Sequence, residues 1–235
     1  MKIDDRVIVI TGTRKGIGRF LAEYYLAQNM IVCGCSRSAC DLDNSKYIHY
    51  ELDVADEKAV EKMVNDIYKR FRKIDYLVNN AGIASMNHSL LTPLSVVEKI
   101  FQTNVYGTFV FCREVARIMA KRKYGRIINF TTVATPLYLD GESVYSASKS
   151  AIEQLTRVLA KELGGSGITC NAVGPSPVKT DLIKNIGDEK IKKLLDKQAI
   201  HRFADFNDIV NVINFYIDNR SSMITGQIIY LGGVF

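Results

Sequence analysis

Short apolar runs alternate along this chain with longer segments of helical periodicity, and this alternation constrains the fold more than any other feature. The runs predicted as strands are residues 6–10, 30–35, 47–52, 74–79, 126–131, 168–173 and 227–231. The segments predicted as helices are residues 17–28, 57–72, 95–121, 144–163 and 207–218. Because runs such as Val7-Ile8-Val9-Ile10 suit strands buried on both faces, the order predicts right-handed β-α-β crossovers. We therefore expect an α/β fold, with residues 1–235 forming a single domain around a doubly wound sheet of about seven parallel strands with helices on both faces.

The charge balance of the chain argues against several classes of partner. The 235 residues include 31 Lys and Arg against 25 Asp and Glu, and the basic residues are scattered among acids rather than gathered with aromatics. A nucleic-acid partner is therefore not expected. No apolar run reaches the length of a membrane-spanning helix, and the charged start of the chain leads directly into the first strand. We expect no membrane partner and a cytosolic location.

Five cysteines raise the question of metal or disulfide chemistry. Cys33, Cys35, Cys40 and His49 lie close in sequence, so a zinc site has to be considered. However, Cys33 and Cys35 stand two residues apart on a predicted strand, which points both side chains the same way without tetrahedral spacing. We therefore expect reduced, buried thiols and no metal.

A glycine-rich turn directly follows the first predicted strand, with the spacing G-x-x-x-G-x-G over residues 12–18. Glycines at a strand-to-helix turn let the backbone approach a pyrophosphate, and the helix N-terminus supplies oriented N–H groups. Such a turn can also be purely structural, but its position after a buried strand favours a nucleotide. The candidate cofactor-binding residues in it are Gly12, Arg14, Lys15, Gly16, Ile17 and Gly18.

The end of the second predicted strand indicates which dinucleotide binds. An acidic residue there would bind the ribose hydroxyls of NAD and repel a 2′-phosphate, but this chain has Ser36 and Arg37. Arg37 offers a planar fork for a phosphate, and Lys15 adds a second positive charge. The sequence therefore predicts NADP(H). Asp53, followed by Val54 at the end of the third strand, either accepts a hydrogen bond from adenine or caps a turn, and both readings stay open.

Tyr145 and Lys149 open a predicted helix four residues apart, which places both side chains on one face of it. A phenol is a poor acid–base catalyst at its ordinary pKa, but a neighbouring ammonium lowers that pKa towards neutrality. The pair is therefore a candidate for general acid–base chemistry.

Together with these motifs, the whole chain resembles the short-chain dehydrogenase/reductase family. The matching elements stand in the family's order: the glycine-rich turn, Asp53, Asn79-Asn80-Ala81-Gly82, Asn104, Tyr145 with Lys149, and Asn171-Ala172-Val173-Gly174-Pro175. The part after residue 200 looks most like the 3-oxoacyl-[acyl-carrier-protein] reductase branch. The resemblance implies a Rossmann-type fold, hydride transfer between NADP(H) and a ketone or secondary alcohol, and a homodimer or homotetramer.

The resemblance also implies roles for individual residues. Tyr145 would give or take the substrate proton, Lys149 would lower the phenol's pKa and hold the nicotinamide ribose, and Asn104 would hold a water linked to Lys149. Thr132 stands where the family has a serine that orients the substrate oxygen, and it keeps the hydroxyl. The cofactor would also contact Asn80, Ala81, Gly82, Pro175, Val178 and Thr180.

Two departures from the family pattern leave the substrate open. Ser176 replaces the family's glycine, a change expected to reshape the loop beside the nicotinamide, and Ser166 stands where the reductase branch often has a basic residue. The predicted substrate pocket draws on residues 83–91 and 134–139 and on a covering insertion at 176–204, with Leu137, Tyr138 and Leu139 making it apolar. Asn87, His88 and Asp140 could supply polar lining. The alternatives to a 3-oxoacyl thioester are a sugar, a polyol or a cyclic ketone, or a non-catalytic NADP-binding sensor or scaffold.

Overall fold

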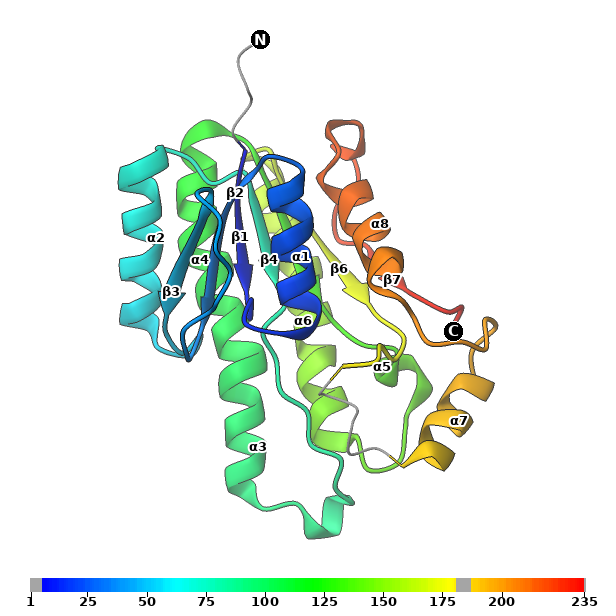
Figure 1. Ribbon diagram of the computed structural model, residues 1–235. Helices are drawn as coiled ribbons and strands as arrows, with labels where there is room; N and C mark the ends of the chain where they lie inside the picture. Colours follow the sequence, from blue (N-terminus) through cyan, green and yellow to red (C-terminus); the bar gives the residue numbers. More distant parts are fainter. Residues whose placement is uncertain (1–5, 181–186, 235) are drawn as a thin grey trace.

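The computed structural model describes residues 6–180 and 187–234, and its centre is a seven-stranded sheet in which all neighbouring strands pair in parallel (Figure 1). The strand order across the sheet is β3-β2-β1-β4-β5-β6-β7. The strands are β1 (Val7–Thr11), β2 (Ile31–Ser36), β3 (Tyr47–Glu51), β4 (Tyr76–Asn79), β5 (Gly125–Phe130), β6 (Ile168–Gly174) and β7 (Ile228–Tyr230). The predicted fold class is confirmed.

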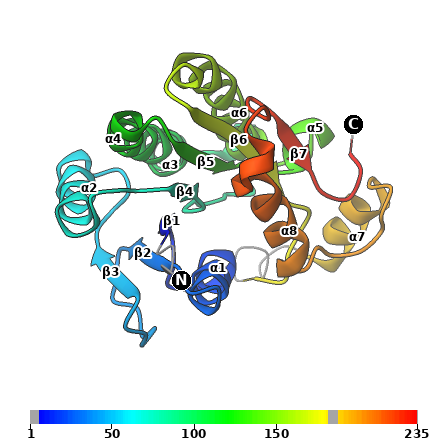
Figure 2. The same ribbon diagram turned by 90° about the horizontal axis from the view of Figure 1, so that it is seen from above.

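Helices cover both faces of this sheet. Figure 2 shows α1 (Gly16–Ala27) and α8 (Phe206–Ile217) on one face, and α2 (Glu57–Phe71), α4 (Gly107–Arg122) and α6 (Ser143–Gly164) on the other. The described residues also contain a π-helical turn, treated below, together with three shorter helices and two 3-10 turns: α3 (Leu94–Phe101), α5 (Ala134–Leu137), α7 (Asp188–Asp196), η1 (Ser89–Leu91) and η4 (Asn219–Ser221).

Strand β1 shows how one apolar run builds two cores. Val7 and Val9 pack into the cluster beneath α2, α4 and α6, whereas Ile8 and Ile10 pack into the cluster beneath α1 and α8. Successive side chains of a strand point to opposite faces, and all four are fully buried. Burying each aliphatic side chain contributes about 1.5–3 kcal/mol. A strand covered on both faces therefore has to be apolar throughout.

The order of the strands positions the site. Strand β1 pairs with β2 on one side and with β4 on the other, so the chain reverses its direction of travel across the sheet at β1. Loops that leave neighbouring strands in opposite directions open a crevice at the carboxyl ends of those strands. The glycine-rich turn follows β1 and Asn80 follows β4, so both stand at this crevice.

The continuous helix predicted over residues 95–121 is wrong in one respect. A π-helical turn, η2 (Gln102–Tyr106), separates α3 from α4 and completely buries Asn104. The Asn104 carbonyl oxygen accepts a hydrogen bond of 2.7 Å from Thr108 Oγ1. A π turn inserts one extra residue into a helix, and such insertions are frequent at functional sites. Helical periodicity does not detect a single inserted residue.

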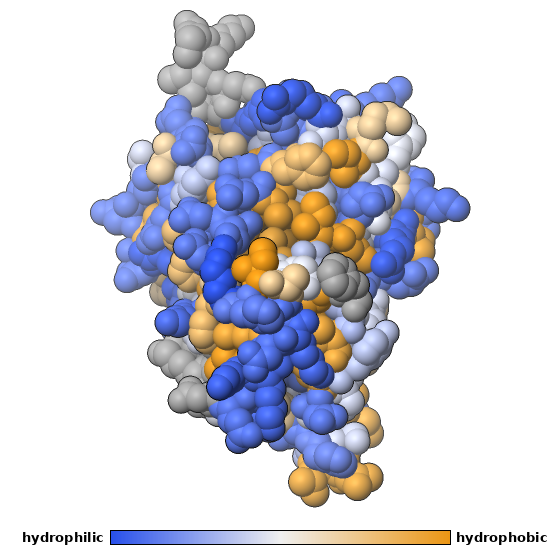
Figure 3. Space-filling view, turned by 90° about the vertical axis from the view of Figure 1, so that its right-hand side faces the viewer, coloured by the Kyte–Doolittle hydropathy of each residue, from blue (hydrophilic) through white to orange (hydrophobic). Residues whose placement is uncertain are grey.

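The predicted insertion at 176–204 contains one regular element, helix α7, and residues 181–186 of it lie outside the described residues. Val178 forms a β-bridge with Ala204, which joins the two ends of the segment. The face that carries α7 is turned towards the viewer in Figure 3, and hydrophilic residues gather over its lower half. Four exposed lysines of α7 and its C-terminal end belong to this segment: Lys190, Lys192, Lys193 and Lys197.

The cysteines lie as reduced thiols. Cys33 and Cys35 are buried in the core, where loss of water raises the pKa of each thiol to about 12, and Cys40 is half-buried. Within residues 6–180 and 187–234, no three His, Cys, Asp or Glu side chains come together as a metal site would require. No helix in the same ranges has the length and apolar character needed to cross a membrane.

Candidate active site

One cleft of about 970 Å³ lies at the carboxyl ends of the strands and gathers nearly every predicted site residue. Its volume is in the range of cofactor and small-molecule sites. The predicted residues that line it are Gly12, Arg14, Lys15, Gly16, Ile17, Ser36, Arg37, Asp53, Val54, Asn80, Ala81, Gly82, Thr132, Tyr145, Lys149, Pro175, Val178 and Thr180. Gly18 and Asn104 are not among the lining residues, because both are buried beneath the surface of the cleft.

The glycine-rich turn is held in a shape that only glycines allow. Gly12 has a positive φ of 78°, and a Cβ on Gly18 would lie 2.2 Å from the Gly12 carbonyl oxygen. Lys15 stands at the N-cap of α1, and an ammonium cannot accept hydrogen bonds from the N–H groups of the first helical turn. Those N–H groups and the positive end of the helix dipole suit a phosphate. The turn therefore fits a pyrophosphate.

The loop after β2 carries the positive charge expected for a phosphate. Arg37 lines the cleft together with Arg14 and Lys15, and the strand ends in Ser36 rather than in an acid. These residues fit a dinucleotide that carries an additional phosphate on its adenosine ribose.

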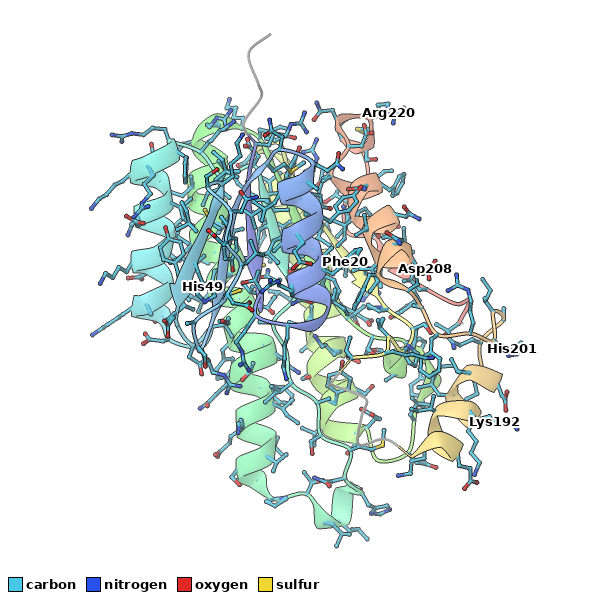
Figure 4. All side chains as sticks on the ribbon, viewed as in Figure 1. Phe20, His49, Lys192, His201, Asp208 and Arg220 are labelled. Atoms are coloured by element: carbon cyan, nitrogen blue, oxygen red, sulfur yellow. The ribbon has the colours of Figure 1, made fainter. Side chains whose placement is uncertain are left out.

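A chain of hydrogen bonds beneath this loop was missed by sequence reasoning. Thr13 Oγ1 lies 2.7 Å from the Tyr47 hydroxyl, which lies 2.8 Å from His49 Nδ1. His49 Nε2 in turn lies 3.2 Å from Ser36 Oγ and 3.1 Å from the Ser38 carbonyl oxygen. His49 stands on β3, beside the loop that it contacts (Figure 4). The only available signal was the alternation of Tyr47 and His49 on one face of a predicted strand.

Asp53 lines the cleft and also caps a turn. Its Oδ1 accepts a hydrogen bond of 2.9 Å from the backbone N–H of Ala55, as the structural reading of this residue requires. The second carboxylate oxygen leaves acceptor capacity for a ligand. The two readings of Asp53 are therefore compatible.

The segment after β4 connects the two halves of the site. Asn80 Nδ2 donates to the Thr11 carbonyl oxygen at 2.9 Å, and the Ala81 N–H donates to Thr11 Oγ1 at 2.9 Å. A Cβ on Gly82 would lie 3.3 Å from Asn104 Oδ1 and 3.4 Å from Lys149 Nζ. Glycine at this position therefore lets the cofactor-side loop pass close to the catalytic helix.

Asn79, by contrast, ties strands together. Its Nδ2 donates to Asn129 Oδ1 on the neighbouring strand β5 at 2.9 Å, and its side chain is buried. Asn79 therefore has a structural role in the sheet.

Tyr145 and Lys149 lie on one face of α6, at the start of the helix. The Lys149 ammonium is 5.9 Å from the centre of the Tyr145 ring and donates to the Phe130 carbonyl oxygen at 2.8 Å. Burial lowers the pKa of Lys149 to about 8. Burial and the nearby Glu142 raise the pKa of Tyr145, while a hydrogen bond with Thr132 acts in the opposite direction. Desolvation therefore outweighs the other effects on Tyr145 in this arrangement, and a lowering of the phenol's pKa by Lys149 stays a prediction.

Thr132 and Asn104 occupy different layers of the site. Thr132 lines the cleft, and its Oγ1 accepts from the Ala134 N–H at 3.2 Å. The Asn104 side chain accepts from the Ile83 N–H at 2.9 Å and donates to the Ile83 carbonyl oxygen at 2.9 Å and to Ser148 Oγ at 3.0 Å. Asn104 thus joins the π turn to the loop after β4 and to α6.

The loop after β6 carries Ser176 without a left-handed backbone. Ser176 is not among the described residues with a positive φ, so a serine fits its conformation here, and a loop shape that differs from the family's stays a prediction. Thr180 comes close to the glycine-rich turn, since a Cβ on Gly16 would lie 3.7 Å from Thr180 Cγ2. This loop therefore closes the cleft over the start of α1.

The substrate end of the cleft differs in part from the predicted pocket. Leu139, Asp140 and His88 line the cleft as predicted, but Asn87, Leu137 and Tyr138 are not among its lining residues. Tyr138 is 87% exposed and has a positive φ of 48°. Sequence reasoning missed Glu142. The predicted insertion at 176–204 does line the cleft, through one face of α7 and the residue after it: Lys190, Ile191, Lys193, Leu194 and Lys197.

A doubly wound sheet with a phosphate-binding turn and a Tyr–Lys pair in one cleft defines a Rossmann-type oxidoreductase. A family model described as enoyl-(acyl carrier protein) reductase matches residues 12–233, and the chain belongs to the short-chain dehydrogenase/reductase family.

Proteins similar to this chain match it over almost its full length. It is 32% identical over 243 residues to the 3-oxoacyl-[acyl-carrier-protein] reductase FabG of Buchnera aphidicola subsp. Baizongia pistaciae, with 99% of this chain and 98% of the relative covered. The FabG of Escherichia coli K12 is 28% identical over 239 residues, with 99% and 98% covered.

Solved structures give the same result for the fold. The structure of ElxO with NADP bound superposes with a TM-score of 0.88 at 28% identity, covering 97% of each chain. The ligand-free aldohexose dehydrogenase of Thermoplasma acidophilum superposes with a TM-score of 0.87 at 26% identity, covering 97% of this chain and 93% of the neighbour.

Proposed function

We propose that this protein is an NADP(H)-dependent carbonyl reductase or alcohol dehydrogenase that transfers a hydride between the nicotinamide and a ketone or secondary alcohol. The observation that carries the proposal is that one cleft contains both the glycine-rich turn with Arg37 and the side chains of Thr132, Tyr145 and Lys149. The NADP named with the ElxO structure supports the choice of cofactor. In this proposal residues 1–235 act as one nucleotide-binding domain, with 176–204 covering its cleft.

Residues at the cofactor end would hold the dinucleotide. Backbone N–H groups at the start of α1 would bind the pyrophosphate, and Arg37 with Lys15 would bind the 2′-phosphate. Asp53 and Val54 would contact the adenine, and Thr180 the nicotinamide carboxamide. When bound, NADP(H) supplies or accepts the hydride.

Residues at the catalytic end would move and position the proton. Tyr145 keeps its hydroxyl proton at neutral pH, since its pKa is raised, and it would donate that proton to the carbonyl oxygen during reduction. Thr132 would orient the same oxygen. Lys149 is cationic below about pH 8 and would stabilise negative charge as it develops on the phenol oxygen. Asn104, held by Ile83 and Ser148, would position a water that links Lys149 to solvent.

Two substrate classes have support. The names of the FabG relatives favour a 3-oxoacyl group carried by an acyl carrier protein. The polar side chains that line the substrate end, including His88, Asp140 and Glu142, favour a hydroxylated ketone, sugar or polyol. The aldohexose dehydrogenase among the similar structures is named for a substrate of this second class.

The assembly of the protein is also a proposal. Tyr106 at the end of η2, Phe109 on α4 and Val158 on α6 are exposed apolar side chains. Exposed apolar residues of this kind support the homodimer or homotetramer that the family resemblance implies. The cytosolic location stays a prediction.

The substitution Tyr145→Phe tests the proposed chemistry. Loss of the hydroxyl should lower kcat for ketone reduction by about 1,000-fold, because the general acid is removed, while NADPH binding measured by fluorescence stays within about 3-fold. Tyr138→Phe is the matched control, since Tyr138 is exposed and lies outside the cleft lining. Retained turnover in Tyr145→Phe would refute the mechanism. Tight NADPH binding without oxidation by any ketone of a broad panel would favour the sensor alternative.

A further inference from the structure

Two buried polar groups that line the cleft have no hydrogen-bond partner within the described residues. They are Oε2 of Glu142, at the N-cap of α6, and Oγ of Ser176, in the loop after β6. Glu142 is 6% exposed and Ser176 is 4% exposed. A buried carboxylate or hydroxyl without a partner destabilises a protein by about 1–3 kcal/mol, so such groups are rare, and beside a cleft a ligand or an ordered water supplies the partner.

A second glutamate on the same helix shows how this fold treats a carboxylate that has only a structural role. Glu153 is also 6% exposed, but its Oε1 accepts hydrogen bonds of 2.6 Å from both Thr131 Oγ1 and the Tyr230 hydroxyl. Glu153 therefore has two donors from the protein at one oxygen, whereas Glu142 Oε2 has none among the described residues. The difference lies in what each glutamate faces, since Glu142 lines the cleft and Glu153 does not.

Glu142 lies at the substrate end, beside the proposed catalytic acid. It precedes Tyr145 by three residues, which is about one helical turn, and its charge raises the pKa of the Tyr145 hydroxyl. Lys190 of α7 acts on Glu142 from the other side of the cleft and favours its ionised form. Burial raises the pKa of Glu142 to about 7, so a substantial fraction is ionised at neutral pH. A substrate carbonyl at Tyr145 thus has an acceptor close by.

We propose that Glu142 and Ser176 form a hydroxyl-binding subsite, so that the substrate is a ketone or secondary alcohol with a further hydroxyl group close to the reacting carbon. This inference rests on the proposed function and deepens it. A substrate hydroxyl donates a hydrogen bond to the Glu142 carboxylate and accepts one from the Ser176 hydroxyl. A plain alkyl or 3-oxoacyl chain has no donor for Glu142 and would leave its carboxylate buried and unpaired.

The test compares hydroxyacetone with acetone, two ketones that differ by one hydroxyl group. With NADPH as reductant, the wild-type protein should prefer hydroxyacetone by about 100-fold in kcat/KM, because a site built for a hydroxyl rejects the analogue without one. Glu142→Leu should reduce this preference to below about 5-fold by raising KM for hydroxyacetone. Because Glu142 also raises the pKa of Tyr145, the measured quantity is the ratio of the two kcat/KM values and not the acetone rate alone. Ser176→Ala should reduce it by a smaller factor. Glu162→Gln, an exposed charge removal on the same helix, is the control and should keep the full preference.

Binding without turnover separates this inference from the proposed function. In the Tyr145→Phe background with NADPH present, calorimetry should detect hydroxyacetone binding that is at least about 10-fold weaker when Glu142→Leu is added. Glu142→Gln, which keeps the size of the side chain, should give an intermediate loss. Glu142-dependent binding in a protein that never turns over a ketone would support the subsite and overturn the proposed function.

Other results would overturn the hydroxyl-binding subsite, either alone or together with the proposed function. Equal wild-type kcat/KM values for acetone and hydroxyacetone, both abolished by Tyr145→Phe, would overturn the subsite and leave the proposed function standing. The same holds if the wild-type protein prefers the acetoacetyl thioester of N-acetylcysteamine over hydroxyacetone and Glu142→Leu raises the thioester rate. Absence of both turnover and binding would overturn both proposals.

Discussion

The two ends of the cleft treat their polar groups in opposite ways. At the cofactor end, defined by the glycine-rich turn and the ends of β1 to β3, side chains bond to one another: Thr13 contacts Tyr47, which contacts His49, which contacts Ser36. At the substrate end, defined by residues 132–142, Ser176 and the inner face of α7, the buried oxygens Glu142 Oε2 and Ser176 Oγ have no partner in the described parts of the chain.

This difference separates two kinds of binding surface. A cofactor end whose polar groups are already paired holds its shape before binding and loses little conformational entropy when the dinucleotide arrives. A substrate end with unpaired polar groups is less stable, and its binding energy depends on what the substrate supplies. Substitutions at the cofactor end should therefore weaken both stability and NADPH binding, whereas substitutions at the substrate end should change selectivity and can raise stability.

The largest effect is expected from Gly18→Ala. The new Cβ would lie 2.2 Å from the Gly12 carbonyl oxygen and 2.5 Å from Asn80 Nδ2, so the backbone of the turn has to move. We expect NADPH affinity, measured by fluorescence titration, to fall by at least about 100-fold and the melting temperature to drop, since overpacking costs about 1–3 kcal/mol. Gly164→Ala is the control, because its Cβ meets nothing within 4 Å. Normal NADPH affinity in Gly18→Ala would show that the turn is not preformed.

Arg37→Asp should have the next largest effect. Replacing a phosphate-binding cation by an acid removes charge-assisted hydrogen bonds worth about 1.5–3 kcal/mol, so the preference for NADPH over NADH should fall by about 30-fold. Kd values for both nucleotides provide the measurement. Arg220→Asp is the control, since Arg220 pairs with Asp218 at the opposite end of the molecule (Figure 4). An unchanged preference would mean that the loop after β2 does not select the cofactor.

His49→Phe should weaken NADPH binding by a smaller factor, about 5-fold, without changing kcat. The hydrogen bonds of His49 are with Ser36, the Ser38 carbonyl oxygen and Tyr47, none of which is proposed to contact the nicotinamide. His49 therefore acts as a positioning residue for the loop after β2. Losing the hydrogen bonds at the two ring nitrogens of His49 lets the loop move, at about 0.5–1.5 kcal/mol for each bond. His201→Phe, an exposed histidine outside the cleft lining, is the control. An effect on kcat alone would contradict a positioning role.

The sequence was sufficient for features with a regular period or a fixed motif. Buried strands such as β1 are apolar throughout, so their positions and the fold class follow from the pattern. Asp56 directly precedes the helix predicted over residues 57–72, a position where aspartate is a preferred N-cap, and its side chain accepts a hydrogen bond from the Ala59 N–H. Motif order brought nearly all of the predicted site residues to one cleft, because loops at the carboxyl ends of parallel strands meet at one edge of the sheet.

The features that the sequence did not predict depend on contacts between segments far apart in the chain or on local backbone geometry. The π turn at Asn104 comes from one extra residue that leaves the amino-acid pattern helical. Tyr138 is exposed and has a positive φ, and no turn motif in the sequence indicates either feature. The isolation of Glu142 depends on the absence of a donor near it among the described residues, and the pairing of Glu153 depends on Tyr230, 77 residues away. Spacing within one element indicates none of these.

The smallest expected effect, Glu142→Gln on stability, tests the substrate end directly. The pKa of Glu142 rises from 4.5 to about 7 on folding, so between these values the folded state keeps a proton that the unfolded state has lost. The free energy of unfolding of the wild-type protein therefore falls as pH rises through this window, by at most about 3 kcal/mol and by about 1 kcal/mol after allowance for relaxation and water access. Glutamine does not titrate, so Glu142→Gln should match the wild-type protein at pH 4.5 and be about 1 kcal/mol more stable at pH 8 in urea unfolding.

Glu153→Gln is the control and should shift stability in the opposite direction at pH 8, because Thr131 and Tyr230 donate to the Glu153 carboxylate. If both variants lose stability, Glu142 is a structural group like Glu153, and the contrast between the two ends of the cleft is wrong.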